Sequence, residues 1–429
     1  MLICHFEDHA VADLEPLTLT RPVFELLCGC TTLGAKQSSY FSCAAAGAIV
    51  RPYLAGLLAE QRPDLPVNDT SWMRRGPVVM VNGRWLPPEG NFDSSGIDIK
   101  SFVGTLGKEI AYAVLSPEQI TGCSPDTLDD FLDGWARTMP RREAGGTLVA
   151  RAWDLVQHNA EEILRDLRRS GGDLRGGFRP LDMTLVGPAS GLVIDPSVRL
   201  EPMVVADTTN GPVILHRDVS VSAFTRLEGP CFIGSGSQLR GAKIRSGTTI
   251  GRCCRIGGEV EASIVHGFTN KYHEGFLGHS YVGEWVNIGA GAQTSDLRND
   301  YGEVIVTVGG TPVPTGQSKA GSYIGDHTKI GLGSLLNTGS NIGVFASMLP
   351  AGKLLPRYVP SFCAVSHGVL AVNNDTEMLF ATAEEVMRRR GVRMSETQHE
   401  VYRRVYDETG LHRKQALREL DPRKHLRVA

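Results

Sequence analysis

Three histidines lie close together in the second half of the chain: His266, His273 and His279. Three neutral imidazoles, with a fourth position left open for water, are a common set of ligands for catalytic zinc. His266 and His273 fall in an irregular segment, however, so the sequence does not place the three rings around one point. We therefore treat zinc chemistry as a minor alternative.

His279 also stands near the start of Phe276–Asn299, which reads FLGHSYVGEWVNIGAGAQTSDLRN. Two hexapeptides in this stretch each begin with an aliphatic residue and a glycine, at Val282-Gly283 and Ile288-Gly289. The polar run Thr294–Asn299 follows them. Because function is concentrated in loops that a rigid scaffold holds in place, we expect the chemistry of the protein here.

The scaffold is indicated by a six-residue period that begins near residue 193. Its aliphatic positions, with one deletion and one central break, are Leu215, Val221, Leu227, Ile233, Leu239, Ile244, Ile250, Ile256, Ile324, Ile330, Leu336 and Ile342. Such a hexapeptide repeat is typical of a parallel β-helix, in which about three short strands make one triangular coil. The aliphatic side chains point inward, and glycines permit tight corners. Two interruptions, Ala262–Ser280 and Arg298–Ser322, are expected to project as loops.

The residues before the repeat indicate a mixed α/β domain. Met1–Phe6, Gly76–Val81 and Ile110–Leu115 are apolar runs typical of buried strands. Apolar and charged residues alternate with helical spacing at Arg51–Glu60 and, more clearly, at Ala152–Arg169. A connector rich in glycine and arginine follows, so we expect the first domain to span residues 1–185.

The repeat is lost after residue 366, which gives a second expected domain at 186–366 and a third at 367–429. The third contains apolar residues at helical spacing in Glu377–Arg390, Ser395–Glu408 and Lys414–Leu420. A β-helix that simply stops exposes an unpaired strand edge. We therefore expect these helices to cap the open end.

Composition excludes several classes of protein. The formal net charge of −3 gives no sign of a nucleic-acid or membrane partner. The N-terminus lacks the pattern of a secretory signal, and no apolar run reaches the roughly 18 residues of a membrane span. Nine cysteines without a CxxC pair are typical of buried thiols in a reducing compartment, so we expect a cytoplasmic protein.

With these residues in view, the chain resembles the bifunctional UDP-N-acetylglucosamine pyrophosphorylase/glucosamine-1-phosphate N-acetyltransferases, in particular a divergent bacterial branch of sugar nucleotidyltransferases. The resemblance implies a Rossmann-like nucleotidyltransferase domain, a left-handed β-helix and a helical tail. It implies acetyl-CoA-dependent N-acetylation of an amino-sugar-1-phosphate, such as glucosamine-1-phosphate, and uridylyl transfer to make UDP-N-acetylglucosamine. It also implies a homotrimer, because the family's acyl-CoA groove forms between neighbouring prisms.

The β-helix carries the more specific match. The family's His-x-x-Tyr-x-Gly, Asn-hydrophobic-Gly-Ala-Gly and Asn-Tyr-Asp segments have counterparts at His279–Gly283, Asn287–Gly291 and Asp296–Arg298. The resemblance makes His279 the general base, a role that suits histidine at working pH. It assigns substrate contacts to Tyr281, Asn287, Asp296 and Arg298, and acetyl-CoA contacts to Gly289, Ala290 and Ala346. In two departures, His279 and Tyr281 are one residue closer than usual, and Asp296 replaces an asparagine.

The N-terminal match is looser, because the segment Glu15–Pro22 lacks the family's glycine-rich phosphate loop. Thr20-Arg21 resembles the end of that loop, and Lys36 follows at a plausible distance, so Arg21 and Lys36 are the expected substrate contacts. Arg84 follows the strand where the family usually has a Mg²⁺-binding aspartate. Asp154 is then the expected metal ligand.

Two alternatives remain open. The protein could be a non-catalytic scaffold that binds sugar nucleotides, which the altered phosphate loop favours. Less favoured is a zinc enzyme of the γ-carbonic-anhydrase type, which would use His266, His273 and His279.

Overall fold

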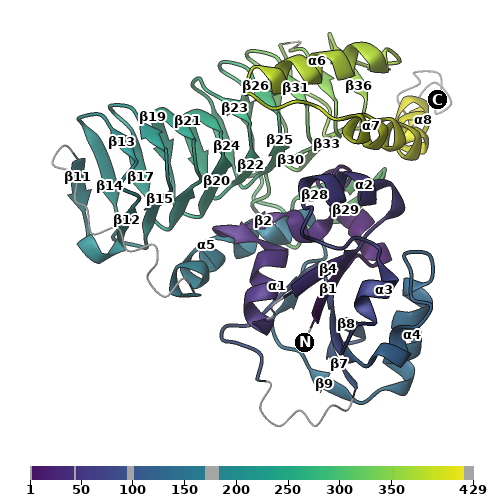
Figure 1. Cartoon of the computed structure of the whole chain (residues 1–429). Helices are drawn as coiled ribbons and strands as arrows, with labels where there is room; N and C mark the ends of the chain where they lie inside the picture. Colours follow the sequence, from purple (N-terminus) through teal and green to yellow (C-terminus); the bar gives the residue numbers. More distant parts are fainter. Residues whose placement is uncertain (1, 43–44, 94–100, 170–182, 351, 420–429) are drawn as a thin grey trace.

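The computed structural model describes residues 2–42, 45–93, 101–169, 183–350 and 352–419. An N-terminal α/β domain lies against one side of a long parallel β-solenoid, and C-terminal helices lie along the solenoid near its far end (Figure 1). Within the described residues, no helix is both long enough and apolar enough to cross a bilayer.

The N-terminal domain is built on a six-stranded sheet with the order β4-β1-β5-β8-β7-β9. Its strands are β1 (Leu2–Phe6), β4 (Ala45–Ile49), β5 (Val78–Asn82), β7 (Phe102–Leu106), β8 (Glu109–Leu115) and β9 (Arg141–Glu143). Its helices are α1 (Leu33–Phe41), α2 (Pro52–Gln61), α3 (Thr70–Met73), α4 (Leu128–Thr138) and α5 (Ala152–Arg169). The three strands and two helices predicted for this domain are therefore present.

The solenoid has three faces. The first face contains β12 (Leu192–Ile194), β15 (Val213–Leu215), β18 (Cys231–Ile233), β20 (Thr248–Arg252), β22 (Ile264–Gly267), β25 (Tyr281–Glu284), β30 (Ser322–Ile324), β33 (Ser340–Ile342) and β35 (Tyr358–Val359). The second contains β13 (Arg199–Leu200), β16 (Ser220–Val221), the first parts of β19 (Gln238–Ile244) and β21 (Arg255–Glu261), β23 (Asn270–Lys271), β26 (Asn287–Ile288), β31 (Lys329–Ile330), β34 (Ser347–Met348) and β36 (Cys363–Ser366). The third contains β11 (Met183–Val186), β14 (Val204–Asp207), β17 (Arg226–Glu228), the ends of β19 and β21, β24 (Phe276–Gly278), β27 (Gln293–Thr294) and β32 (Leu335–Leu336).

The predicted hexapeptide period is confirmed by the pairing of these strands. Ile233 pairs with Ile250, and Val282 pairs with Ile324, so equivalent aliphatic positions stack from coil to coil. These side chains are buried in one continuous core inside the prism. We name the corner between the first and second faces the first corner, that between the second and third faces the second corner, and that between the third and first faces the third corner.

The prediction that Ala262–Ser280 projects as a loop is wrong. The segment continues the solenoid as β22, β23 and β24. The period was hidden by Lys271, which pairs with Ile256 at an inward position and is buried. Its Nζ donates to the corner carbonyl oxygen of Gly257 at 2.8 Å and to that of Gly275. A lysine can occupy this aliphatic position because the corner supplies acceptors for its ammonium group.

The second interruption does project. It forms the antiparallel hairpin of β28 (Ile305–Val308) and β29 (Thr311–Pro314). Val304 and Val306, at the start of this hairpin, join the apolar cluster of Val11 and Leu14 in the N-terminal domain. The insertion thus fastens the solenoid to that domain.

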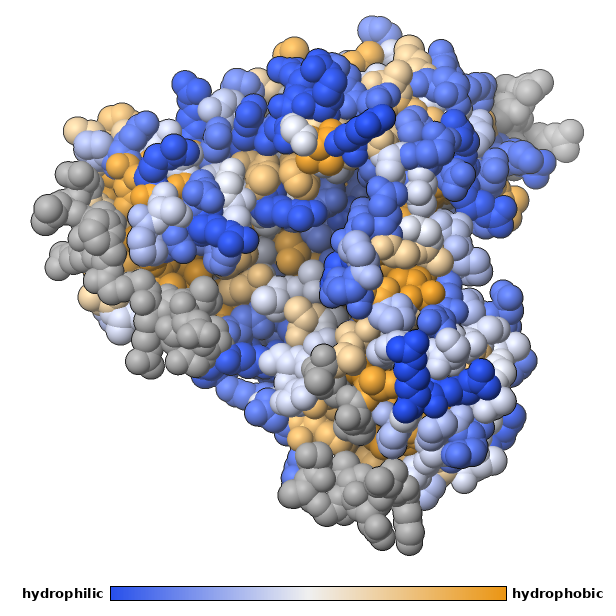
Figure 2. Space-filling view, in the orientation of Figure 1, coloured by the Kyte–Doolittle hydropathy of each residue, from blue (hydrophilic) through white to orange (hydrophobic). Residues whose placement is uncertain are grey.

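The C-terminal helices are α6 (Thr376–Arg388), α7 (Glu396–Glu408) and α8 (Gly410–Glu419), close to the predicted segments. They do not simply cap the open end. The last strand edge is covered by β37 (Val369–Val372), which pairs antiparallel with β36. Helices α6 and α7 lie along the first corner, whereas α8 packs on β37 and its Ala416 joins the solenoid core; the outer surface of the tail is largely hydrophilic (Figures 1 and 2).

At the first corner, aromatic rings stack in a column that the helices cover. Its members all have positive φ angles and are Phe268, Trp285, His327, Phe345 and Phe362. Phe380 of α6 and Tyr402 of α7 pack edge-on against Phe345. The tail is therefore held by a stack that repeats with the coils.

Polar contacts also join α5 to the first face. Asn159 Nδ2 donates to the carbonyl oxygen of Gly247 at 2.7 Å, and Asn159 Oδ1 accepts from the amide of Gly29 at 2.7 Å. Thr249 Oγ1 donates to the carbonyl oxygen of Gly29 at 2.9 Å. Three buried residues from distant parts of the sequence thus fix how the N-terminal domain sits.

Candidate functional site

The third corner brings His279 and Asp296 together. His279 follows β24 with a φ of 45°, and its Nδ1 lies 2.7 Å from Asp296 Oδ2. Its main chain is held by Glu261 on one side and Gly321 on the other, at 3.0 and 2.9 Å. The two side chains are 20% and 13% exposed. A carboxylate that accepts from Nδ1–H leaves Nε2 as the ring nitrogen that can accept a proton.

Tyr281 lies only two residues further but on the first face, turned toward the N-terminal domain. It is fully buried, and its hydroxyl accepts from the Leu27 amide at 2.9 Å and donates to the Leu27 carbonyl oxygen at 3.2 Å. A sugar cannot reach it in this arrangement. Tyr281 therefore joins the domains, and we leave it out of the site.

The other residues expected to bind substrate or acetyl-CoA are spread around the prism. Asn287 begins β26 on the second face and is exposed. Gly289 and Ala290 follow at the second corner, whereas Ala346 is buried at the first. Arg298 lies in the projecting insertion, where its Nε donates to Asp300 at 2.8 Å. Within one chain, these residues do not converge on His279.

The second corner contains His273, which the sequence suggested only as a zinc ligand. His273 is exposed there, beside Glu274. The amide of Gly291 donates to the carbonyl oxygen of Glu274 at 2.8 Å, so His273 lies one coil from Ala290. The irregular sequence around Lys271 concealed this position, because it hid the register of the coil.

The expected nucleotide contacts of the N-terminal domain are already paired with carboxylates. Arg21 forms ion pairs with Asp326, which also accepts from Thr20 at 2.7 Å, and with Glu284 at 3.5 Å. Lys36 is completely buried against Glu162, at 3.0 Å, and Asp166.

The carboxyl end of the N-terminal sheet does not fit a Mg²⁺ site. Arg84 occupies it, and its Nε and Nη2 donate to Asp8 at 2.8 and 2.6 Å. Asp154 accepts from the amides of Ala150 and Arg151, at 2.8 and 2.9 Å, and so caps the start of α5. In the described part of the chain, no three His, Cys, Asp or Glu side chains gather as metal ligands, which also weighs against the zinc alternative.

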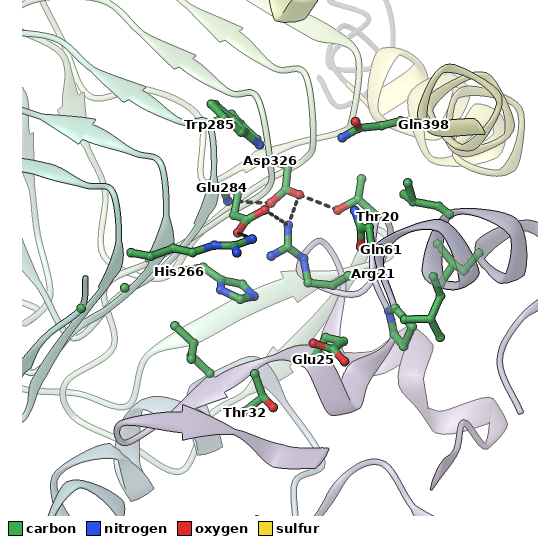
Figure 3. Close-up of a pocket in the computed structure, with 18 of the residues that line it drawn as sticks. Thr20, Arg21, Glu25, Thr32, Gln61, His266, Glu284, Trp285, Asp326 and Gln398 are labelled. Atoms are coloured by element: carbon green, nitrogen blue, oxygen red, sulfur yellow. Dashed lines mark hydrogen bonds and ion pairs between the residues drawn. The ribbon is translucent and has the colours of Figure 1, made fainter. Parts of the chain in front are cut away.

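A cavity of about 410 Å³ lies where the N-terminal domain, the solenoid and α7 meet (Figure 3). Thr20 and Arg21 form one wall, and Glu284 and Asp326 face them from the solenoid. His266 also lines it, with neither ring nitrogen hydrogen-bonded among the described residues. Burial lowers the pKa of His266 well below its ordinary value, so this imidazole is neutral.

The sequence could not indicate this cavity. Gln61 of α2, Trp285 of the aromatic column and Gln398 of α7 line it together, although each belongs to a different part of the chain. Burial also raises the pKa of Glu25 on its wall. A concave space with convergent polar groups is the usual form of a small-molecule site.

Comparison with known proteins adds family information. Residues 3–171 match the family described as sugar nucleotidyl transferase. A bifunctional sugar-1-phosphate nucleotidylyltransferase/acetyltransferase of Sulfurisphaera tokodaii is 35% identical over 92 residues, which are 21% of this chain and 23% of that protein. The bifunctional protein GlmU of Synechococcus elongatus is 34% identical over 130 residues, 30% of this chain and 24% of that protein.

These matches span about a quarter of the length of the curated relatives. The solved structure of the polySia specific acetyltransferase NeuO aligns over 98% of its chain and 49% of this one, with 12% identity and a TM-score of 0.27, too low to support an argument. Residues 3–171 thus resemble the sugar nucleotidyl transferase family, and the chain is similar to a bifunctional protein whose name pairs nucleotidyl transfer with acetyl transfer.

Proposed function

We propose that the solenoid transfers an acetyl group from acetyl-CoA to the amine of an amino-sugar-1-phosphate, with glucosamine-1-phosphate as the expected acceptor. The observation that carries the proposal is the 2.7 Å contact between His279 Nδ1 and Asp296 Oδ2. A histidine held by a carboxylate and open to solvent on its other nitrogen is suited to general-base catalysis.

In the proposed reaction, the amine nitrogen attacks the thioester carbonyl of acetyl-CoA. His279 Nε2 takes a proton from the attacking amine, and Asp296 stabilises the resulting imidazolium. A C–N bond forms, the C–S bond breaks, and the His279 imidazolium returns its proton to the departing thiolate, so CoA leaves as its thiol and atoms and charge balance. The aspartate at position 296, where the family has asparagine, is the residue that gives His279 this partner.

His273 is the second candidate for the base. The stacking of its corner against Gly291 favours it, because Gly289 and Ala290 are the residues that the family resemblance assigns to acetyl-CoA. Either histidine would act as the base of the same reaction, and substitution of each in turn distinguishes them.

Thiol release provides the direct test of this activity. We expect wild-type protein to release CoA thiol when acetyl-CoA is mixed with glucosamine-1-phosphate. N-acetylglucosamine-1-phosphate is the matched control, because it keeps the phosphate but has no free amine, and it should give no release. No release with any amino-sugar phosphate would contradict the proposal and favour a non-catalytic scaffold.

For the N-terminal domain we propose uridylyl transfer to make UDP-N-acetylglucosamine, which the family match over residues 3–171 supports. The test is pyrophosphate release from UTP and N-acetylglucosamine-1-phosphate by folded protein, measured with and without Mg²⁺ because Arg84 occupies the usual place of the metal ligands. Binding of UTP without release would make this domain a binding module instead.

We also propose that the protein is a cytoplasmic homotrimer. The dispersed positions of His279, Ala290 and Ala346 support this, because only neighbouring prisms could bring different corners together. Light scattering should give three times the chain mass of 46.4 kDa, and a monomeric mass would contradict the proposal.

A further inference from the structure

A second pocket, of about 270 Å³, lies between the end of α6 and the second face of the solenoid. Four cationic side chains line it: Arg255 and Lys329 from the solenoid, and Arg389 and Arg390 at the end of α6. None of the described residues that line it is acidic. The pocket therefore concentrates positive charge without a carboxylate to balance it.

The contacts of these cations leave donors unused. Lys329 Nζ donates to the carbonyl oxygen of Trp285 at 2.8 Å. Arg390 donates to the carbonyl oxygen of Cys253 at 2.8 Å and to Asn270 Oδ1 at 2.6 Å. Arg255 Nε is buried, with no hydrogen-bond partner among the described residues. An unsatisfied buried donor is costly and indicates a missing acceptor.

The electrostatics point the same way. Burial lowers the pKa of Lys329 to about 8. Burial, with the nearby charge of Arg255, also lowers the pKa of Arg390. The shift of Lys329 reflects a partly dry site and that of Arg390 also reflects the neighbouring cation, so a bound anion would stabilise both charges. Arginine favours phosphate in particular, because its planar fork matches two phosphate oxygens.

The remaining lining residues limit what the anion is attached to. Asn270 and Asn287 add amide groups that can bond hydroxyls, and Phe268 and Trp285 stack with ring centroids 4.2 Å apart. Hydroxyl-bonding amides beside an aromatic surface are suited to a sugar ring. We propose that this pocket binds a sugar phosphate, with the phosphoryl group among the four cations and the sugar hydroxyls toward the two asparagines.

Such a ligand would contact α6 and the solenoid at once, so its binding would strengthen the attachment of the C-terminal tail. The inference does not depend on the proposed acetyl transfer. A protein that binds sugar phosphate here but transfers no acetyl group would contradict the proposed function and leave this site standing.

Calorimetry with full-length protein tests the site, using glucose-1-phosphate, inorganic phosphate and glucose at constant ionic strength. We expect glucose-1-phosphate to bind about tenfold more tightly than inorganic phosphate and glucose not to bind. Arg255→Gln and Arg389→Gln should each weaken glucose-1-phosphate binding by about 10- to 100-fold, the loss typical of one charge-assisted hydrogen bond.

The matched control is Arg388→Gln, which removes the same charge from the same helix. The Arg388 guanidinium pairs with Glu385 at 2.7 Å, outside the pocket, so this variant should bind like the wild type. Melting without ligand checks folding, and the pocket variants should melt no lower than the control because they relieve repulsion. Equal binding of phosphate and glucose-1-phosphate, or unchanged binding in both pocket variants, would overturn the proposal.

Discussion

At the scale of single residues, the 2.7 Å contact of His279 with Asp296 gives the aspartate a measurable role. Asp296→Ala removes the acceptor that orients the imidazole and stabilises its charged form. We expect acetyl transfer to fall by about 10²-fold, with a smaller loss in Asp296→Asn, because an amide oxygen can still accept from Nδ1–H. Steady-state rates of CoA release measure both losses. Equal rates for Asp296→Ala and wild type would remove Asp296 from the mechanism.

Lys271 makes a second prediction at this scale. Burial lowers its pKa to about 8, so between about pH 8 and 10.5 the unfolded chain holds a proton that the folded chain releases. Neutral Lys271 therefore adds at most about 3 kcal/mol to the free energy of unfolding above pH 10.5. This gain is lost as the pH falls from 10.5 to 8. Denaturant unfolding at pH 8 and pH 10 should show the wild type gaining stability relative to Lys271→Met. Parallel pH dependence of the two proteins would show that Lys271 stays charged.

At the scale of elements, the aromatic column links the coils to the tail. His327 stacks on Phe345, with ring centroids 4.7 Å apart, and its Nε2 lies 2.9 Å from the Tyr402 hydroxyl. Burial lowers the pKa of His327 well below its ordinary value, so its contribution is complete above about pH 6.5 and is lost as pH falls. His327→Phe should remove this acid sensitivity because phenylalanine does not titrate. The Tyr402 hydroxyl still accepts from Gln398 in this variant. Urea midpoints of wild type and His327→Phe are measured at pH 7.5 and pH 5. An equal drop of the midpoint in the two proteins would contradict the role of His327.

Sequence prediction succeeds for these elements where the signal is local. The six-residue period is local, because each coil repeats the same inward position, and α5 was predicted with its observed bounds, Ala152–Arg169. The prediction failed at Ala262–Ser280 because Lys271 uses corner carbonyls that only the folded coil supplies. The tail helices were predicted from their own residues, but their location depends on the aromatic column, whose members are separated by whole coils.

At the scale of the whole molecule, Arg21 joins the N-terminal domain to Asp326 and Glu284 of the solenoid. Arg21→Met would leave Asp326 without its cation and Glu284 with only the more exposed Arg252, at 3.8 Å, and we expect a loss of about 3–5 kcal/mol in unfolding free energy. Arg62→Met is the control, because Arg62 is 45% exposed in its pair with Glu25 and should cost less than about 1 kcal/mol. Similar melting of both variants would mean that Arg21 does not hold the domains together.

The site at this scale could be predicted only in part. His279 was identified from a local stretch, but the burial of Tyr281 against Leu27 depends on residues about 250 positions apart, as the 2.9 Å contact between them shows. The same holds for Lys36, whose neutralisation by Asp166 follows from how α5 packs on α1. Docking between domains leaves no periodic pattern in a sequence, so contacts of this kind become visible only in the structure.

We propose that a histidine on the solenoid catalyses acetyl transfer to an amino-sugar phosphate. Mass spectrometry of the N-acetylated product, formed from acetyl-CoA and glucosamine-1-phosphate, tests it in wild type, His279→Ala, His273→Ala and the surface control His9→Ala, whose side chain is 85% exposed. We expect product from wild type and His9→Ala, and a loss of about 10²–10⁴-fold in His279→Ala. Loss in His273→Ala alone would move the base to the second corner, and equal product from all four proteins would contradict the claim.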